Sequence, residues 1–240
     1  MRPATARDEN DSSSSWVEPA ASAERPGTTQ RRIATIRIKV RTGAARWKHT
    51  PARDFLNAMN DVAWMLENLW GPIVAVTAAD GGRTNGLISS TTVTASLLPE
   101  APRVSVLLSR ASLTRELVLG SGAFAVHLLP ADRRGLELFR ELGFRSGRDG
   151  SKLDDVATHV GSVGAPILTD AVSYIEARVA QTVDAEDVTV VVGDVVAGAR
   201  LREGPCLTIE EVRDRLPAAW LDEWERRRER ELDDARRFRR

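Results

Sequence analysis

Short runs rich in β-branched residues recur along the middle of this chain and are separated by turn residues. The first two runs, residues 73–79 and 86–96, flank Asp80-Gly81-Gly82, whose glycines suit a hairpin turn. Four further runs lie at residues 104–108, 124–129, 174–183 and 188–196, and helical patterns lie near 113–119 and 131–142. Because strands and helices do not alternate regularly, the pattern predicts a mainly β antiparallel barrel or sandwich decorated by helices, and disfavours a doubly wound parallel sheet.

The first 70 residues divide into two parts that differ in composition. Residues 1–31 combine serine, proline, alanine and charge with almost no large apolar residue except Trp16, which predicts a disordered tail. Residues 32–70 predict a strand and helix extension, with a short edge strand near 33–40. Its N-terminal helix is expected to start at Thr50-Pro51, since threonine caps free amides and proline suits the first helical position.

The C-terminal segment, residues 208–240, predicts a charged helix that projects from the β domain at residues 71–207. Leu216, Trp220 and Trp224 share one helical face and are expected to pack. The last dozen residues favour a solvated extension, with an arm around a second subunit as the alternative. Three acid–arginine pairs have helical spacing: Asp222–Arg226, Glu223–Arg227 and Asp233–Arg237.

Charge and cysteine content narrow the expected partners. The chain has 34 lysine and arginine residues and 34 acidic residues, so it carries no net field for nucleic acid or an anionic membrane. The single cysteine, Cys206, and three scattered histidines predict neither an internal disulfide nor a metal site. The charge balance leads us to expect small-molecule partners, and the lone cysteine a reducing cytoplasm. No apolar run approaches the length of a membrane span, so we expect no membrane segment.

Two segments could bind a ligand, although the usual nucleotide and nucleophile motifs are absent from the sequence. The hydroxyl-rich run at residues 85–96 could hydrogen-bond a polar ligand along its length, or could be a half-exposed strand. Residues 109–114, Ser-Arg-Ala-Ser-Leu-Thr, place hydroxyls and a guanidinium at an expected helix start. That combination is typical of a phosphate site, and the alternative is an ordinary serine cap beside a surface arginine.

Together these segments resemble the flavin reductase-like family. The matching stretches lie between residues 71 and 198 and read, in chain order, AVTAADGG, NGLISSTTVTASLLPE, VSVLLSRASLTREL, GAFAVHLLPAD, SGRDGSKL and VGDVVAG. The resemblance implies an FMN-binding split β-barrel. It also implies that the flavin ring and ribityl chain contact Asn85, Ser89, Ser90 and Thr91. The flavin phosphate would contact Arg110, Ser112 and Thr114.

The activity implied by the resemblance is hydride transfer from NADH or NADPH to FMN, with FAD as the alternative flavin, within a homodimer that holds flavin near its interface. Reduced flavin would either pass to a partner monooxygenase or react within the same protein. Two alternatives stay open: a flavin-binding electron carrier or oxidoreductase without NAD(P)H:flavin reductase activity, and a dimeric module that has lost its cofactor. No catalytic residue is assigned.

The chain departs from the family pattern at three positions. Val188 stands where many members have a histidine, which leaves nicotinamide handling open. Ile88 replaces a common threonine, so one polar flavin contact is expected to be lost. Glu100 replaces a second proline after Pro99.

Three charged or titratable residues near these motifs also have structural explanations. His127 could donate a proton, but a lone histidine in an alternating strand is usually packed or solvent-facing. Arg148 and Lys152 could reach a phosphate, but a glycine-rich charged loop is by default a solvated connection. None of the three is assigned to the site.

Overall fold

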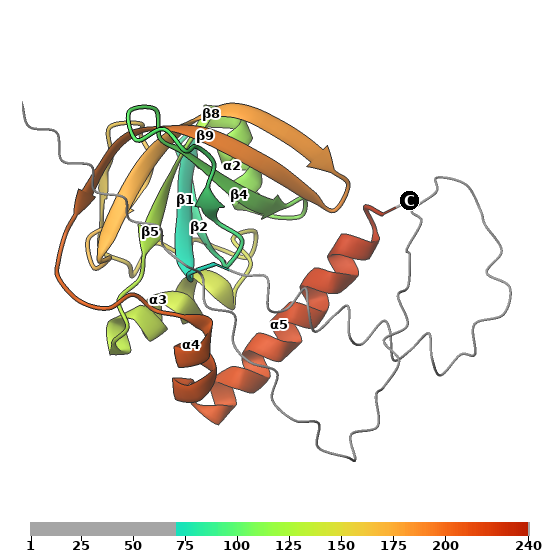
Figure 1. The fold of residues 1–240 in the computed structure, drawn as a ribbon. Coiled ribbons are helices and arrows are strands. Elements are labelled where there is room, and N and C mark those ends of the chain that lie inside the picture. The colour runs from blue at the N-terminus through green and yellow to red at the C-terminus, as the bar shows by residue number, and fades with distance from the viewer. Residues whose placement is uncertain (1–70, 240) are drawn as a thin grey trace, which may run out of the picture. The chain divides into compact units, whose positions relative to one another are not determined.

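The computed structural model describes residues 71–239, so the strand and helix expected within residues 32–70 lie outside the described residues. Within that range, seven strands form one antiparallel sheet in the order β2-β1-β5-β8-β9-β4-β3 (Figure 1). Their bounds are β1 (Val74–Asp80), β2 (Arg83–Ser89), β3 (Val93–Thr94), β4 (Arg103–Ser109), β5 (Ala123–Leu128), β8 (Ser173–Ala185) and β9 (Val188–Arg200). The predicted antiparallel, mainly β fold is confirmed.

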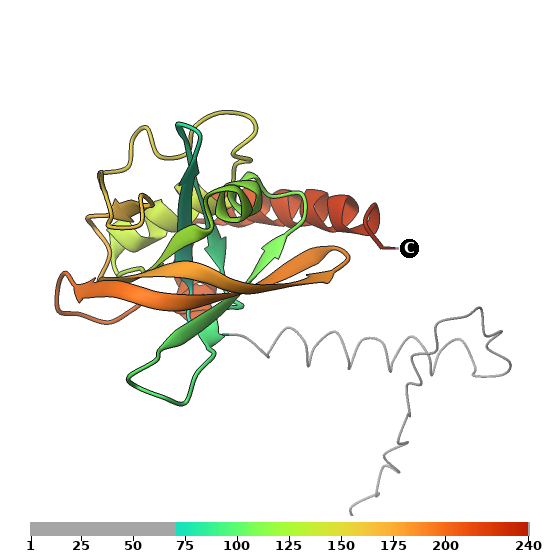
Figure 2. The ribbon, with the colours of Figure 1, turned by 90° about the horizontal axis from the view of Figure 1, so that it is seen from above.

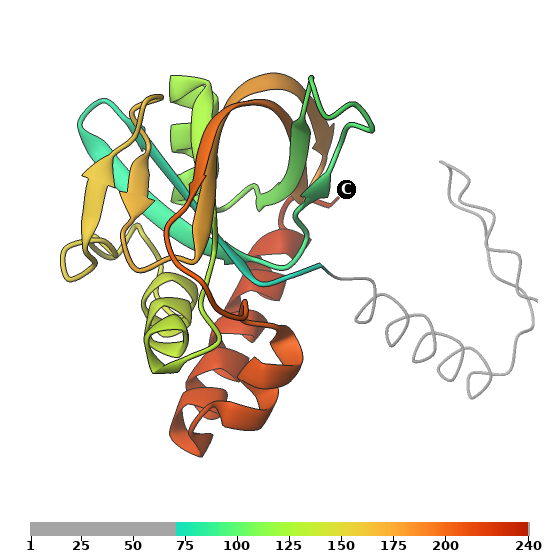
Figure 3. The same ribbon diagram turned by 60° about the vertical axis from the view of Figure 1, so that its left-hand side comes forward.

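The sheet curls along its length, and its two long strands, β8 and β9, arch over the others (Figures 2 and 3). A second, two-stranded sheet contains β6 (Thr158–Val160) and β7 (Pro166–Leu168). The predicted β1–β2 hairpin is present, with Asp80 paired to Arg83 across the turn. Gly81 and Gly82 have φ angles of 55° and 77°, a left-handed conformation that glycine adopts without steric cost.

Two apolar clusters hold the helices against this sheet. One cluster lies between the sheet and α2 (Leu113–Ser121), and includes Val76, Val106 and Leu117. The other cluster joins β1 to α3 (Arg133–Gly143) and to the C-terminal helices. Both helices were predicted from sequence, and both positions are confirmed.

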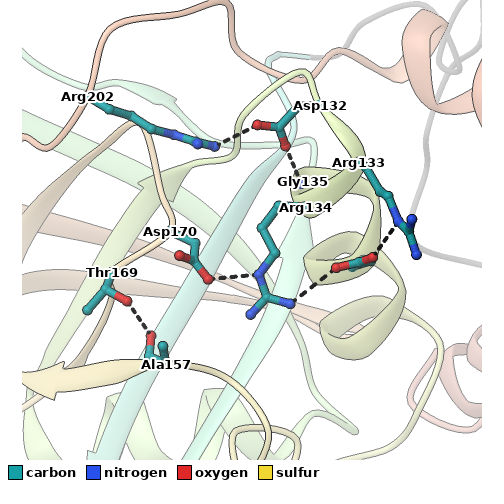
Figure 4. A network of polar contacts seen from close by, with 9 residues as sticks. Asp132, Arg133, Arg134, Gly135, Ala157, Thr169, Asp170 and Arg202 are labelled. Carbon is teal, nitrogen blue, oxygen red and sulfur yellow. Dashed lines mark hydrogen bonds and ion pairs between the residues drawn. The ribbon is translucent and has the colours of Figure 1, made fainter.

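A polar network fixes the amino end of α3 (Figure 4). The Asp132 side chain caps the helix by accepting a 2.9 Å bond from the Gly135 N–H, and its second oxygen lies 3.1 Å from Arg202. Arg134 Nε donates to Asp170 at 2.7 Å. A Cβ on Gly135 would lie 1.8 Å from the Pro130 carbonyl oxygen, so only glycine fits this first turn. The network joins α3 to the loop before β8 and to the segment that follows β9.

The C-terminal segment forms two helices where the sequence pattern indicated one. They are α4 (Ile209–Arg215) and α5 (Ala218–Arg236). Pro217 separates them, because proline lacks an N–H group and disfavours a helical conformation at the preceding residue; Leu216 has φ −67° and ψ 133°. Among the helices of residues 71–239, none combines the length and apolar character needed to cross a bilayer.

The tryptophan end of α5 packs as predicted. Trp220 and Trp224 lie against the cluster that contains α3, and the Arg140 guanidinium is 4.5 Å from the Trp220 ring centroid. Arg140 also pairs with Glu223 at 3.1 Å. Glu223 therefore binds Arg140 of α3, and not Arg227 as its helical spacing predicted. Arg227 pairs with Glu231 and Arg237 with Asp234, while Asp233, the predicted partner of Arg237, pairs with Arg236.

Replacing Asp132 by alanine removes the cap of α3 and the partner of Arg202. We expect the free energy of unfolding, measured by urea titration, to fall by about 1 kcal/mol. The same change at Asp154, which is exposed, is expected to alter it by less than about 0.5 kcal/mol. Equal losses at the two positions would contradict the capping role.

Candidate flavin site at the amino end of α2

Helix α2 lies alongside β1 and β2 with a defined polarity. At its carboxyl end, a Cβ on Gly120 would lie 2.3 Å from the Asp80 carboxylate at the β1–β2 turn. At its amino end, Asn85 Nδ2 donates a 2.9 Å bond to Thr114 Oγ1. The amino end of α2 therefore faces the part of β2 that follows Asn85. This is the hydroxyl-rich run that sequence analysis selected.

The first turn of α2 has the features of an anion site. Ser112 is the N-cap residue in extended conformation, and its side chain makes no capping hydrogen bond. The first N–H groups of a helix lack partners within the helix, and the helix dipole places partial positive charge there. The Ser112 hydroxyl and these N–H groups can therefore converge on a phosphate.

Two guanidinium groups flank this turn. On one side, Arg110 Nη1 lies 3.3 Å from the Glu186 carbonyl oxygen and 3.5 Å from Asp184 Oδ2. On the other side, Arg148 Nε donates to the Ala111 carbonyl oxygen at 3.2 Å. Arg148 also pairs with Glu116, within the first turn of α2. Sequence analysis did not assign Arg148, and only its charge within the glycine-rich loop pointed to it.

Asn85 supplies a buried hydrogen-bond acceptor next to this turn. The residue is 2% exposed, and Oδ1 has no hydrogen-bond partner among the described residues. A Cβ on Gly147 would lie 2.4 Å from the Asn85 amide, so the loop backbone passes closely over it. Leaving a buried acceptor unpaired costs about 1–3 kcal/mol, which a ligand hydroxyl at this position would recover.

The run after Asn85 separates into fixed and available hydroxyls. Ser89 is buried, and its Oγ lies 3.2 Å from the Thr91 N–H, from Thr91 Oγ1 and from Thr92 Oγ1. Ser89 therefore holds the end of β2 in shape. Ser90 is half-buried and Thr91 is exposed, so these two are open to a ligand. β2 is an edge strand of the described sheet, and one of its backbone carbonyls, that of Gly86, is occupied by Lys152.

These groups fit FMN in kind and in spacing. Four residues of extended chain separate Asn85 from Ser89, a length of about 13 Å. A phosphate at the first turn of α2 would thus lie at one end of this span, and a polar ring edge near Ser90 and Thr91 at the other. Of the residues implied for FMN by the resemblance, Asn85 and Thr114 are in direct contact. The Arg110 guanidinium lies against the β8–β9 hairpin, and Arg148 is added at the turn before α2.

Lys152 has a structural role in the same region. Its Nζ donates to the Leu142 carbonyl oxygen at 2.6 Å and to the Gly86 carbonyl oxygen at 3.1 Å. Burial, together with the nearby Arg227, lowers the pKa of Lys152 to about 8. Its contacts join β2 to the last turn of α3. Its ammonium group is engaged by these two carbonyl oxygens and is not assigned to the anion site at α2.

His127 is likewise part of the core. It is fully buried on β5, where Nε2 accepts a 3.2 Å bond from the Leu168 N–H. Its Nδ1 therefore carries the proton and donates to the Ala75 carbonyl oxygen at 3.3 Å. Burial lowers the pKa of His127 to about 4. The ring is neutral and holds β7 against β1.

Two of the departures from the family pattern have a clear place in the structure. Val188 pairs with Ser109, immediately before Arg110, and its side chain can neither donate nor accept a hydrogen bond. Ile88 packs against the cluster beneath α3, where its side chain would be 3.3 Å from a Cβ on Gly143. An apolar residue at position 88 thus contributes to the core.

The family of the chain follows from comparison with known proteins. Residues 66–211 match the family model described as a flavin reductase like domain, and the chain belongs to this family. The ferric-chelate reductase (NAD(P)H) of Archaeoglobus fulgidus is 32% identical over 134 residues, which cover 55% of this chain and 78% of that protein. The high molecular weight rubredoxin of Moorella thermoacetica is 30% identical over 144 residues, which cover 60% and 62%.

Solved structures of low identity share the fold. The NADH:FAD oxidoreductase SgcE6 of Streptomyces globisporus superimposes with a TM-score of 0.54 at 19% identity, covering 68% of this chain and 94% of that one. The curled antiparallel sheet is therefore the split barrel of the flavin reductase-like family. The chain spans less than two thirds of the Moorella relative, at 62% of its length.

The buried His127 makes the stability of the fold sensitive to acid. Its pKa is near 6.5 when unfolded and about 4 when folded, so the unfolded state binds more protons between these values. We expect the stabilisation to be present above pH 6.5 and to be lost as the pH falls towards 4, by roughly 3 kcal/mol in total. Urea titrations at several pH values measure this loss. His127→Gln should show a flatter pH profile, and an unchanged profile would contradict the assignment.

Proposed function

We propose that this chain binds FMN and catalyses hydride transfer to it from NADH or NADPH. The observation that carries the proposal is the first turn of α2, where an uncapped helix end lies between Arg110 and Arg148 and beside the unpaired acceptor of Asn85. An anion with an attached chain of hydroxyls satisfies all of these groups at once.

Each residue has one role in this proposal. Arg110, Arg148 and Ser112 bind the phosphate, together with the N–H groups of the first turn. Thr114 acts through Asn85, whose Oδ1 accepts a hydrogen bond from a ribityl hydroxyl. Ser90 and Thr91 contact the edge of the ring, and Ser89 positions them.

The chain's contribution to the reaction is positioning. The bound flavin supplies the ring that accepts a hydride. The residues of β2 and α2 hold that ring in one orientation, so that a nicotinamide can stack on its free face and water is excluded from between them. Stacking of the two rings and hydride transfer between them need no acid or base from the protein. This agrees with the apolar side chain of Val188 and with the structural role of His127.

We also infer a homodimer. Val93 lies within the hydroxyl-rich run and Leu97 and Leu98 directly follow it; all three are exposed, with Leu97 fully so. Exposed apolar residues next to a ligand site are explained if a second copy covers them and completes the pocket. A partner monooxygenase that accepts reduced flavin, and a cytoplasmic location, are the remaining parts of the proposal and are supported by the family resemblance and the single cysteine.

An anaerobic absorbance titration tests the activity. The full chain is mixed with FMN, and then NADH and NADPH are added in turn. We expect the flavin band at roughly 450 nm to bleach with at least one of them. Bound flavin that stays oxidised with both would favour the electron carrier instead. Flavin that does not bind would overturn the proposal.

Arg110→Ala tests the phosphate site. We expect the affinity for FMN to fall by about 1.5 to 3 kcal/mol, roughly 10- to 150-fold, because a charge-assisted contact is lost. The affinity for riboflavin, which has no phosphate, should change little. Arg103→Ala is the matched control, since Arg103 lies at the other end of β4 and pairs with Asp194 at 2.7 Å. Equal losses for FMN and riboflavin would contradict the phosphate assignment.

A further inference from the structure

A pocket of about 420 Å³ lies between the carboxyl end of α5 and the β8–β9 hairpin. In Figure 1, α5 runs from α4 towards the tip of this hairpin. The volume falls within the range of small-molecule sites in proteins. Five residues line the pocket: Arg110, Asp184, Glu186, Arg237 and Phe238. Two of these come from the C-terminal residues, which the proposed flavin site does not use.

The C-terminal residues are held in place at both ends of α5. At the start of the helix, Trp220 and Trp224 pack on the core. Beyond its end, Arg239 Nε donates to Asp187 Oδ1 at 2.9 Å, in the turn of the hairpin. The Phe238 ring lies between these anchors, with its centroid 5.3 Å from Arg110 Cζ. The packing of α5 and the Arg239–Asp187 ion pair thus hold the Phe238 ring at the pocket.

The lining residues suit a purine nucleotide. A base can stack on the phenyl ring of Phe238 and on a guanidinium plane. Arg110 and Arg237 provide planar donors for a phosphate. The carboxylates of Asp184 and Glu186 can accept hydrogen bonds from ribose hydroxyls, as acidic residues do in dinucleotide sites.

We propose that this pocket binds an adenosine phosphate, the adenylate half of a dinucleotide. Arg110 belongs both to the turn before α2 and to the pocket, and its backbone N–H donates to the Asp187 carbonyl oxygen at 2.9 Å, which ties this turn to the hairpin. A ligand with a phosphate at α2 can therefore extend its second half over Arg110 towards Phe238. The two sources of this chemistry are FAD and NAD(P)H, and the assignment to either rests on the proposed function.

Binding of 5′-AMP to the full chain without flavin tests the pocket directly. We expect Phe238→Ala to weaken AMP about tenfold, because the stacking surface is lost, and Phe238→Trp to retain binding. Arg237→Ala should also weaken AMP. Arg236→Ala is the matched control, since Arg236 pairs with Asp233 at 2.5 Å and does not line the pocket. No binding of AMP by the unmodified chain, or equal affinity in Phe238→Ala, would overturn the proposal.

Two further measurements on Phe238→Ala identify the source. If the adenylate belongs to FAD, the affinity for FAD falls about tenfold relative to that for FMN. If it belongs to the nicotinamide nucleotide, the KM for NADH or NADPH rises about tenfold while kcat with bound flavin is retained. A variant that changes neither quantity would overturn the proposal. Failure of the unmodified chain to reduce FMN would instead contradict the proposed function, because the AMP titration does not depend on flavin.

Discussion

The hydrogen bond from Asn85 to Thr114 joins the edge strand β2 to the first turn of α2. It fixes which end of the helix faces the hydroxyl-rich run, and thereby where the positive end of the helix dipole lies. The same side chain leaves Oδ1 buried without a described partner. One residue thus orients the helix and holds an unpaired acceptor beside its first turn. Arg110 and Arg148 can act on the same anion as the helix dipole only because the amino end of α2 lies at this turn.

The titratable groups near the site contribute to folding. His127 holds neighbouring strands through a neutral ring, and Lys152 joins β2 to α3 through two carbonyl oxygens. Burial lowers the pKa of both groups, and each is already engaged by backbone partners. A site of this kind works by holding a redox cofactor and excluding water, so the absence of an assigned acid or base agrees with the proposed chemistry.

Local sequence signals predicted most strands of the seven-stranded sheet, the glycine turn at 81–82 and the start of α2, because each depends on residues close together in the chain. They did not predict β6 and β7, and the single run at 86–96 is divided between β2 and β3. Contacts between distant segments were not predictable in this way. Arg148 reaches the turn before α2 from a loop 37 residues later, and Glu223 pairs with Arg140 of α3. The break at Pro217 was missed although proline signals it, since the tryptophan stripe continued across the gap. The roles of the hydroxyls differ because Ser89 is engaged by its own neighbours.

The central claim is that a phosphate lies at the amino end of α2 between two guanidinium groups. Phosphorus NMR of FMN bound to the full chain, followed as the pH is lowered, tests it most directly. Phosphate monoesters take up a second proton near pH 6, and cationic donors lower this pKa. We expect the resonance of bound FMN to stay that of the dianion well below pH 6. A bound phosphate that titrates like free FMN would contradict it.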